Sequence, residues 1–544
     1  MEGSKFIKIG RSPITHLPPE ILESILCQLP NSDIKSLRAT CIHLNQVVPL
    51  RLSRVFLSPN PVNVDVFRAI ADHEIFRKNI IEIIYDDARF ADSLAEGEVS
   101  VRDFNDDSDD YNDIGDVSGV PAWYLRQYRD NAGCIDFYGV QDVKRPHHIE
   151  VAERFKSRPS PAESYRLYQD LLRGQDQVIA ANSDAGALRY GLSRFTNLQR
   201  ITITPAAHGS PVQPLYQTPM IRSLPPGLIY PLPRGWPIAE EGENEPFAES
   251  WYGDEKSKWR GFCLVTSVAA QYFRENPAAS IFEFVVDTNH LLTGISCRLF
   301  DDAGSPEYKD LVTILSQPGL SRIDMSLLVG GQDEQGWHAF RSGCLHRALR
   351  RAPGLQCVKL STNLGDPENL DDPMATDGED HWMPLRTIFP VEMWPNLRHF
   401  CLSRFIVKQA DVVRLLLALP LTLQSVELSF LSFVQNSDHY QGLLEDMRSK
   451  LGWRERPATE RPKIVIYGDH EPQVQEKPID VSHEAENFLY GDGKNPFQRS
   501  AIASGTGLRV DKFDPNFERP NACSLDLMRL GIVEKDDWYR KHHR

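Results

Sequence analysis

The chain has 544 residues, of which 41% are hydrophobic and 25% are charged, a composition typical of a folded globular protein. Asp and Glu (75) outnumber Lys and Arg (60), and the formal charge of -15 disfavours nucleic acid as the main ligand. No apolar run reaches the roughly 18 residues that a membrane-spanning helix needs, so we expect no membrane segment.

Cysteine usage and the amino terminus predict the cellular compartment. The nine cysteines are odd in number, scattered and never spaced as C-x-x-C, as is typical of small buried thiols in a reducing compartment. The first residues lack the basic-then-apolar pattern of a secretory signal. These features predict an intracellular protein, cytoplasmic, nuclear or both.

Helical signals open the chain. Pro18 and Pro19 suit a first helical turn, and an apolar stripe at helical spacing follows them as far as Pro30. Asn31 to Asp33 supplies N-cap residue types for a second helix, and a third short helix is expected before Pro49. Three such short helices bury little surface by themselves, so we expect part of their apolar surface to contact another protein.

Residues 61–194 are predicted to form a mixed, mainly helical connecting region. A strand-like run extends from Ile80 to Tyr85, and the acidic segment 101–118 has too few apolar residues to pack, which indicates a loop. Nine prolines between residues 205 and 237 disfavour regular helix and central strand, so we expect an extended insertion over residues 205–250.

A pattern of the form L-x-x-h-x-h, in which h is apolar, recurs through residues 195–470. Leucine leads six copies and isoleucine one, and the copies begin at Leu198, Ile281, Leu292, Leu320, Leu355, Leu397 and Leu423. Helix, turn and short strand in repetition predict an α/β fold built as an irregular leucine-rich-repeat solenoid, with parallel strands on the concave face and helices outside. An ordinary α/β domain is the alternative, because its buried strands also read as apolar runs.

The positions between the apolar residues of these strands are the candidates for contact with a ligand. They are Thr202, Asp324, Lys359, Cys401 and Glu427. Their mixed charge indicates no single sign of ligand. Residues 471–544, with several glycines, are predicted to form a carboxy-terminal tail of loops.

The amino-terminal segment resembles a known motif. Leu17-Pro18-Pro19-Glu20-Ile21-Leu22 and the apolar positions up to Leu44 resemble the F-box over about residues 14–57. The sequence departs from the motif at Leu44, near where Trp is common. An F-box followed by irregular leucine-rich repeats is similar to the F-box/leucine-rich class, and the strings Asp86–Phe90 and Gly491–Phe497 are similar to large F-box proteins of filamentous fungi.

This resemblance implies a non-catalytic adaptor. Its F-box, placed at residues 1–60, would dock on the Skp adaptor of a Skp–cullin–F-box ubiquitin ligase, while the remaining chain holds an unknown protein target. The docking candidates are Leu17, Pro18, Ile21, Leu22, Ile25, Leu26, Ile34, Leu37 and Leu44. We expect one side of these helices to pack inward and the other to meet the partner. The alternative is an F-box scaffold that binds proteins without directing ubiquitination.

Local motifs for catalysis or metal binding are absent from the sequence. The acidic run 106–110 lacks the Gly and Glu positions of an EF-hand loop, and Gly491–Lys494 lacks the flanking residues of a P-loop. Cys344 and His346, two residues apart on a predicted helix, point in different directions and do not form a nucleophile–base pair. A hydrolase on an α/β body has no such support, and we predict no metal and no cofactor.

Overall fold

The computed structural model describes most of the chain. The described residues are 14, 17–29, 31–48, 50–92, 119–141, 156, 158–209, 214–238, 246–279, 281–289, 291–332, 335–364, 382–434, 438–468 and 479–497. The acidic segment predicted at 101–118 lies outside them.

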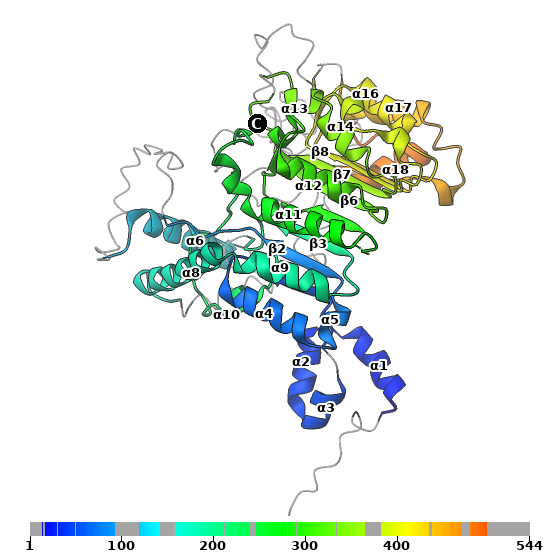
Figure 1. Cartoon of the computed structure of the whole chain (residues 1–544). Helices are drawn as coiled ribbons and strands as arrows, with labels where there is room; N and C mark the ends of the chain where they lie inside the picture. The colour runs from blue at the N-terminus through cyan, green and yellow to red at the C-terminus, as the bar shows by residue number, and fades with distance from the viewer. Residues whose placement is uncertain are drawn as a thin grey trace, which may run out of the picture.

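A ten-stranded sheet forms the centre of the molecule (Figure 1). Its strands are β1 (Arg54–Leu57), β2 (Glu82–Asp86), β3 (Arg200–Thr204), β4 (Glu283–Val286), β5 (Ile295–Ser296), β6 (Arg322–Leu328), β7 (Cys357–Thr362), β8 (His399–Ser403), β10 (Ser425–Ser429) and β12 (Lys463–Val465). Every pairing is parallel, and apart from β5, which pairs with β6 alone, the strands are neighbours in chain order. The chain therefore builds the sheet one strand at a time from one edge to the other.

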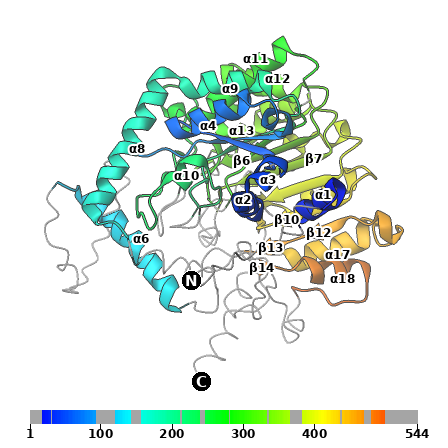
Figure 2. The same ribbon diagram turned by 90° about the horizontal axis from the view of Figure 1, so that it is seen from below.

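The helices between these strands lie along one face of the sheet (Figures 1 and 2). They include α4 (Pro61–Asp72), α9 (Ser183–Arg194), α11 (Arg260–Glu275), α12 (Pro306–Leu315), α14 (Cys344–Leu349), α16 (Gln409–Ala418) and α17 (Tyr440–Lys450). A parallel pair of strands needs such a returning segment, and repeated returns on one side leave the other face of the sheet open.

One apolar side chain from each strand faces these helices. In register across the nine strands that follow chain order are Val55, Ile83, Ile201, Phe284, Ile323, Val358, Phe400, Val426 and Ile464. All nine are buried in the main hydrophobic core. Burying a side chain of this size contributes roughly 1.5–3 kcal/mol, so this row is a major contact between sheet and helices.

Six of the seven predicted L-x-x-h-x-h copies form a strand of this series. The exception is the copy led by Leu292, whose two-residue strand β5 pairs with the far end of β6, Ile295 opposite Leu327, so that β4 pairs with β6 directly. Gly294 makes this approach possible, because a Cβ atom there would lie only 2.5 Å from the backbone nitrogen of Leu327.

The sheet begins earlier in the chain than expected. Leu52-x-x-Val55-x-Leu57 and Ile80-x-x-Ile83-x-Tyr85 have the same form as the later copies, and they contain strands β1 and β2. Strands β1 and β2 therefore belong to the same sheet as the strands of residues 195–470, the range in which repeats are predicted.

Two segments predicted to be irregular contain helices. In the proline-rich insertion, α10 (Pro219–Ser223) starts with Pro219 in its first turn, and Thr218 Oγ1 accepts a hydrogen bond from the backbone N–H of Ile221. In the predicted tail, α18 (Ser482–Tyr490) buries Ala485, Phe488 and Leu489 against α17 and β12. A high content of proline or glycine in a segment therefore limits where its helices begin and end, but it does not exclude helices.

Further helices extend the molecule at the end of the sheet near β1 (Figure 1). α6 (Ala122–Gln141), α8 (Pro161–Ala181) and α10 share a smaller, tyrosine-rich apolar cluster. The predicted amino-terminal helices are present as α1 (Pro19–Gln28), α2 (Asn31–Thr40) and α3 (Ile42–Val47), and they project beyond α5 (Phe76–Asn79) (Figure 1).

Candidate functional site

The open face of the sheet is polar, and all five predicted ligand-contact residues lie there in a single row. Across neighbouring strands the row runs Thr202, Val285, Asp324, Lys359, Cys401 and Glu427. Val285, which lies between Thr202 and Asp324, is the one member that is not a predicted contact residue. Thr202, Asp324 and Cys401 are buried, whereas Lys359 and Glu427 are half-buried. The five residues thus share one face of the sheet, and a role in binding stays a prediction.

A second row, two residues earlier on each strand, alternates in charge. We name it the charge ladder: Arg54, Glu82, Arg200, Glu283 and Arg322, on β1, β2, β3, β4 and β6. Opposite charges on neighbouring strands attract each other across the sheet.

The arginines of the charge ladder are all paired. Arg54 Nε lies 2.7 Å from Glu82 Oε2, and Arg200 Nε donates to Glu283 Oε2 at 2.6 Å. Arg322 donates to Asp324 Oδ2 through Nε at 3.1 Å and through Nη2 at 2.5 Å, and these hydrogen bonds raise the pKa of its guanidinium. Charge-assisted pairs of this kind fix the side chains in place, so the ladder is a rigid surface of nearly neutral total charge.

A third row of small hydroxyl side chains crosses the same face. Ser326, Ser361, Ser403 and Ser429 are in register on β6, β7, β8 and β10, and the hydroxyls of Ser326 and Ser361 lie 2.9 Å apart. Ser326, Ser403 and Ser429 are buried, and Ser326 and Ser361 line a cavity on this face.

A cavity of about 290 Å³ lies on this face, and its lining extends from β1 to β7. Ladder residues, Thr202, Lys359, Ser326 and Asp287 line it, and Tyr216 joins them from the segment after β3. The Tyr216 ring lies 5.9 Å from that of Phe56. Burial, with Asp287 and Glu82 nearby, raises the pKa of Tyr216 to about 12, so the phenol keeps its proton at neutral pH.

Lys359 differs from the other cations that line the cavity. Its ammonium makes no hydrogen bond or ion pair with any residue that the structure describes. Burial lowers the pKa of Lys359, but attraction from Cys401, Glu427, Asp324 and Asp287 outweighs it, and the net effect is a raised pKa. The cavity therefore contains an ammonium that is charged at neutral pH and has donors that no described residue uses.

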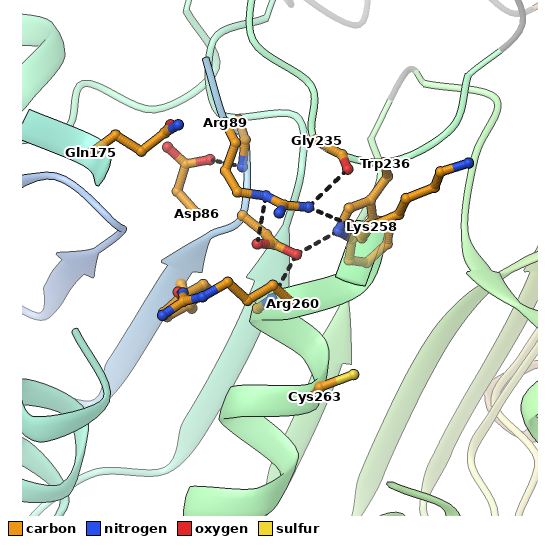
Figure 3. A network of polar contacts seen from close by, with 12 residues as sticks. Asp86, Arg89, Gln175, Gly235, Trp236, Lys258, Arg260 and Cys263 are labelled. Carbon is orange, nitrogen blue, oxygen red and sulfur yellow. Dashed lines mark hydrogen bonds and ion pairs between the residues drawn. The ribbon is translucent and has the colours of Figure 1, made fainter. Parts of the chain in front are cut away.

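A buried polar network lies elsewhere, at the carboxyl end of β2 (Figure 3). Asp87 Oδ2 accepts hydrogen bonds from Trp236 Nε1 at 2.6 Å and from the backbone N–H of Gly261 at 2.9 Å. Arg89 Nη2 donates to the carbonyl oxygens of Gly235 at 3.0 Å and Lys258 at 2.5 Å. The segment 86–90, singled out in the sequence, thus joins β2 to the proline-rich insertion and the start of α11, which is a structural role.

Asp86, the neighbour of Asp87, gives a testable pH dependence. Its Oδ1 accepts from the backbone N–H of Ala88 at 3.0 Å, and its charged neighbours are Asp87 and Arg234. Burial raises the pKa of Asp86 to about 8, against about 3.9 for an unfolded chain. The folded state therefore holds this proton more tightly, and the resulting stability is complete below pH about 4 and is lost as the pH rises through about 8.

We therefore expect Asp86→Asn to flatten the pH dependence of stability. Between pH 6.5 and 8 the unfolding free energy of the wild type should fall relative to that of Asp86→Asn, by on the order of 1 kcal/mol per pH unit. The window starts at 6.5 because buried His208, with its pKa lowered to about 3 by burial and Arg234, affects the slope only at more acid pH. Urea titrations of both proteins at four pH values measure the difference; parallel curves would contradict it.

The amino-terminal helices form a bundle with its own core. Leu22, Leu26, Ile34, Leu44 and Val48 are buried together. A pair of polar residues closes the bundle: Asn31 Nδ2 donates to the carbonyl of Arg51 at 2.5 Å, and Arg51 Nη1 donates to the carbonyl of Cys27 at 3.1 Å. The last residues of the segment are thereby bound to the ends of its first two helices.

Comparison with known protein families identifies this bundle. Residues 14–53 match the F-box domain. F-box domains bind the Skp adaptor within ubiquitin ligases, and proteins that contain one are typically non-catalytic subunits. The match ends one residue before β1 begins at Arg54, so the predicted F-box boundary at residue 60 includes a strand that belongs to the sheet. No curated protein matches the chain.

The nine docking candidates differ in how far the F-box buries them. Pro18, Ile21 and Ile25 are exposed, Ile21 by 50% and Ile25 by 38%, and Leu17 and Leu37 are half-buried. Buried in the F-box core are Leu22, Leu26, Ile34 and Leu44. Four of the candidates thus form the core of the bundle, and a docking role for the nine stays a prediction.

Two exposed apolar residues of the F-box were missed. Ile42 is 79% exposed and Val47 is 43% exposed, both on α3. Helical spacing could have identified Ile42, because it lies two residues before the buried Leu44 and therefore on the other side of the helix, whereas Val47, three residues after Leu44, lies next to the buried stripe and has no such signal.

The other chemical candidates have structural surroundings. Cys344 is buried, as expected, and Arg347 Nη2 lies 2.9 Å from its sulfur, while His346 is half-buried. Among the described residues, no three His, Cys, Asp or Glu side chains are grouped to hold a metal ion. The helices in the described part of the chain include none with the length and hydropathy to cross a membrane.

Proposed function

We propose that this chain is the target-recognition subunit of a Skp–cullin–F-box ubiquitin ligase, acting in the cytoplasm or nucleus. The F-box would dock on the Skp adaptor, and through it on a cullin, while the polar face of the sheet binds a protein target. One observation carries the proposal: a bundle with the F-box sequence completes its own core and still leaves isoleucines in contact with solvent.

The exposed isoleucines supply the driving force for docking. Ile21 and Ile25 are one helical turn apart on α1, so their side chains lie on the same side of it. Full burial of an isoleucine contributes roughly 1.5–3 kcal/mol relative to exposure. If each of the two isoleucines gains only half of this free energy on docking, together they change the affinity more than tenfold.

We further infer that the sheet body is a degenerate leucine-rich-repeat solenoid. Three features support this: L-x-x-h-x-h copies precede or contain its strands, the strands stack in chain order, and the connecting helices stay on one side. Under this proposal, Thr202, Asp324, Lys359, Cys401 and Glu427 contact the target from the concave face. The similarity to filamentous-fungal F-box proteins stays a prediction.

The docking assignment is tested with Ile21→Ala combined with Ile25→Ala in the full chain. We expect binding to the purified Skp adaptor, measured by calorimetry, to weaken about tenfold or more. Both side chains lie outside the F-box core, so the thermal midpoint should not change.

A matched control uses exposed leucines on the body. Leu417 and Leu421 lie at the end of α16 and just after it, and both are exposed. Leu417→Ala with Leu421→Ala should leave Skp adaptor affinity unchanged. Equal affinity of the wild type and the Ile21/Ile25 variant would remove the docking surface from the F-box.

A further inference from the structure

The charged side chains that line the cavity differ in whether they have ion-pair partners within the protein. The ladder arginines Arg54, Arg200 and Arg322 are paired with Glu82, Glu283 and Asp324. Glu82 Oε1 also accepts from Thr202 Oγ1 at 2.8 Å. These groups have their partners within the protein, so a ligand gains little by contacting them.

Two groups of opposite charge in the same cavity have capacity left. Lys359 Nζ has three donors and no partner among the described residues. Asp287 accepts one hydrogen bond, from the backbone N–H of Asn289 to Oδ1 at 2.9 Å, and has no ion pair with any residue in the described ranges. A half-buried ammonium and carboxylate without full partners need hydrogen bonds from solvent or a ligand.

The chemistry that satisfies both groups is a carboxylate next to an N–H donor. The carboxylate would accept from Lys359 Nζ, and the N–H would donate to Asp287. A polypeptide's last residue carries both groups on one unit, and a free amino acid carries them as carboxylate and ammonium. The cavity volume of about 290 Å³ is at the lower end of the range for ligand cavities. A cavity of this size suits the terminal residue of a polypeptide better than an internal segment, whose chain continues on both sides.

We propose that this cavity binds the carboxy-terminal residue of a target polypeptide, with Lys359 holding the terminal carboxylate and Asp287 accepting the hydrogen bond of that residue's amide. Tyr216 and the Ser326 hydroxyl complete the lining. The proposal rests on the proposed function, because it names what the polar face would recognise in a target. Recognition depends on a chain end and not on net charge, in keeping with the near-neutral charge ladder.

Capped dipeptides test the proposal on the full chain bound to its Skp adaptor. The probes are N-acetyl-Ala-Ala with a free carboxylate, the same dipeptide as its amide, and L-alanine, followed by ligand-observed NMR and calorimetry. We expect the free acid to bind and the amide to bind at least tenfold more weakly, because a charge-assisted hydrogen bond is lost. Equal binding of acid and amide, or binding of L-alanine alone, would overturn the assignment to a chain end.

Variants identify the groups responsible. Lys359→Met should weaken binding of the acid about tenfold or more, Lys359→Arg should retain part of it, and Asp287→Asn should weaken it severalfold. Lys463→Met is the matched control, because Lys463 is an exposed lysine on β12, on the same face but outside the cavity. An equal effect of Lys463→Met and Lys359→Met would contradict a specific site. A thermal midpoint for each variant separates lost binding from lost folding.

A parallel measurement separates this inference from the proposed function. Wild type and Lys359→Met are compared for proteins captured in cells with the proteasome blocked, and for Skp adaptor affinity. If no dipeptide binds but Lys359→Met still loses captured proteins, the chain-end inference fails and the target face stands. If neither dipeptides nor captured proteins respond, the target face fails as well, while Skp adaptor affinity reports on the F-box alone.

Discussion

Asp184→Ala is expected to lower the free energy of unfolding of the sheet body by about 3–5 kcal/mol. Asp184, at the start of α9, is fully buried and binds Arg260 of α11 twice, Oδ2 to Nη1 at 2.6 Å and Oδ1 to Nη2 at 3.1 Å. Tyr85 of β2 also donates to Oδ2 at 2.8 Å. The alanine would leave a largely buried guanidinium without its counter-charge.

An exposed ion pair provides the control. Asp170 on α8 pairs with Arg166 and Arg173 in solvent, so Asp170→Ala should change the unfolding free energy by less than about 1 kcal/mol. Urea unfolding followed by tryptophan fluorescence measures both variants. Asp184→Leu combined with Arg260→Met should recover much of the loss, since apolar groups can replace a buried pair. Similar losses for Asp184→Ala and Asp170→Ala would show that burial does not decide the effect.

Gly261→Ala is expected to destabilise the protein by about 3 kcal/mol, although alanine favours helix. Gly261 lies in the first turn of α11, where its N–H donates to Asp87. A Cβ atom there would lie 2.5 Å from Tyr85 Cε1 and 2.6 Å from Asp87 Oδ1. The carboxylate would have to move, and its hydrogen bond from Trp236 would weaken with it.

The matched variant is Gly133→Ala in α6. A Cβ atom at Gly133 would meet no atom within 4 Å, so this change should stabilise the helix by roughly 0.5–1 kcal/mol. The two substitutions are chemically identical and are expected to have opposite signs. Thermal unfolding of both variants measures the contrast, and destabilisation by both would indicate that helix glycines matter here for a reason other than space.

The features of this molecule that repeat along the chain could be predicted from its sequence. Alternating apolar and polar residues set which face each strand buries, and the same offset from each leading Leu or Ile places Thr202 and Glu427 in one row. The three amino-terminal helices were predictable for a related reason: proline, N-cap residue types and an apolar stripe agree with each other over a short span.

Features formed by distant residues could not be predicted. Asp87 and Trp236 are far apart in the chain, and their hydrogen bond depends on how the proline-rich insertion packs. Strands β1 and β2 carry the repeated pattern, but helices α6, α8 and α9 separate them in the chain from the later copies. Helix α18 lies in a segment for which the sequence predicts loops, because this helix is stabilised by burial against α17 and β12, which is a tertiary effect.

Under the proposed function, the stepwise order of the strands sets how far a bound target lies from the ligase. Parallel neighbours are about 4.8 Å apart, so β6, four steps from β1, lies about 19 Å along the sheet from the strand next to the F-box. If the binding contact moved to the neighbouring strand, the bound target would move by about 4.8 Å relative to the ligase. The position of the target along the sheet would then decide which of its lysines the ligase can reach.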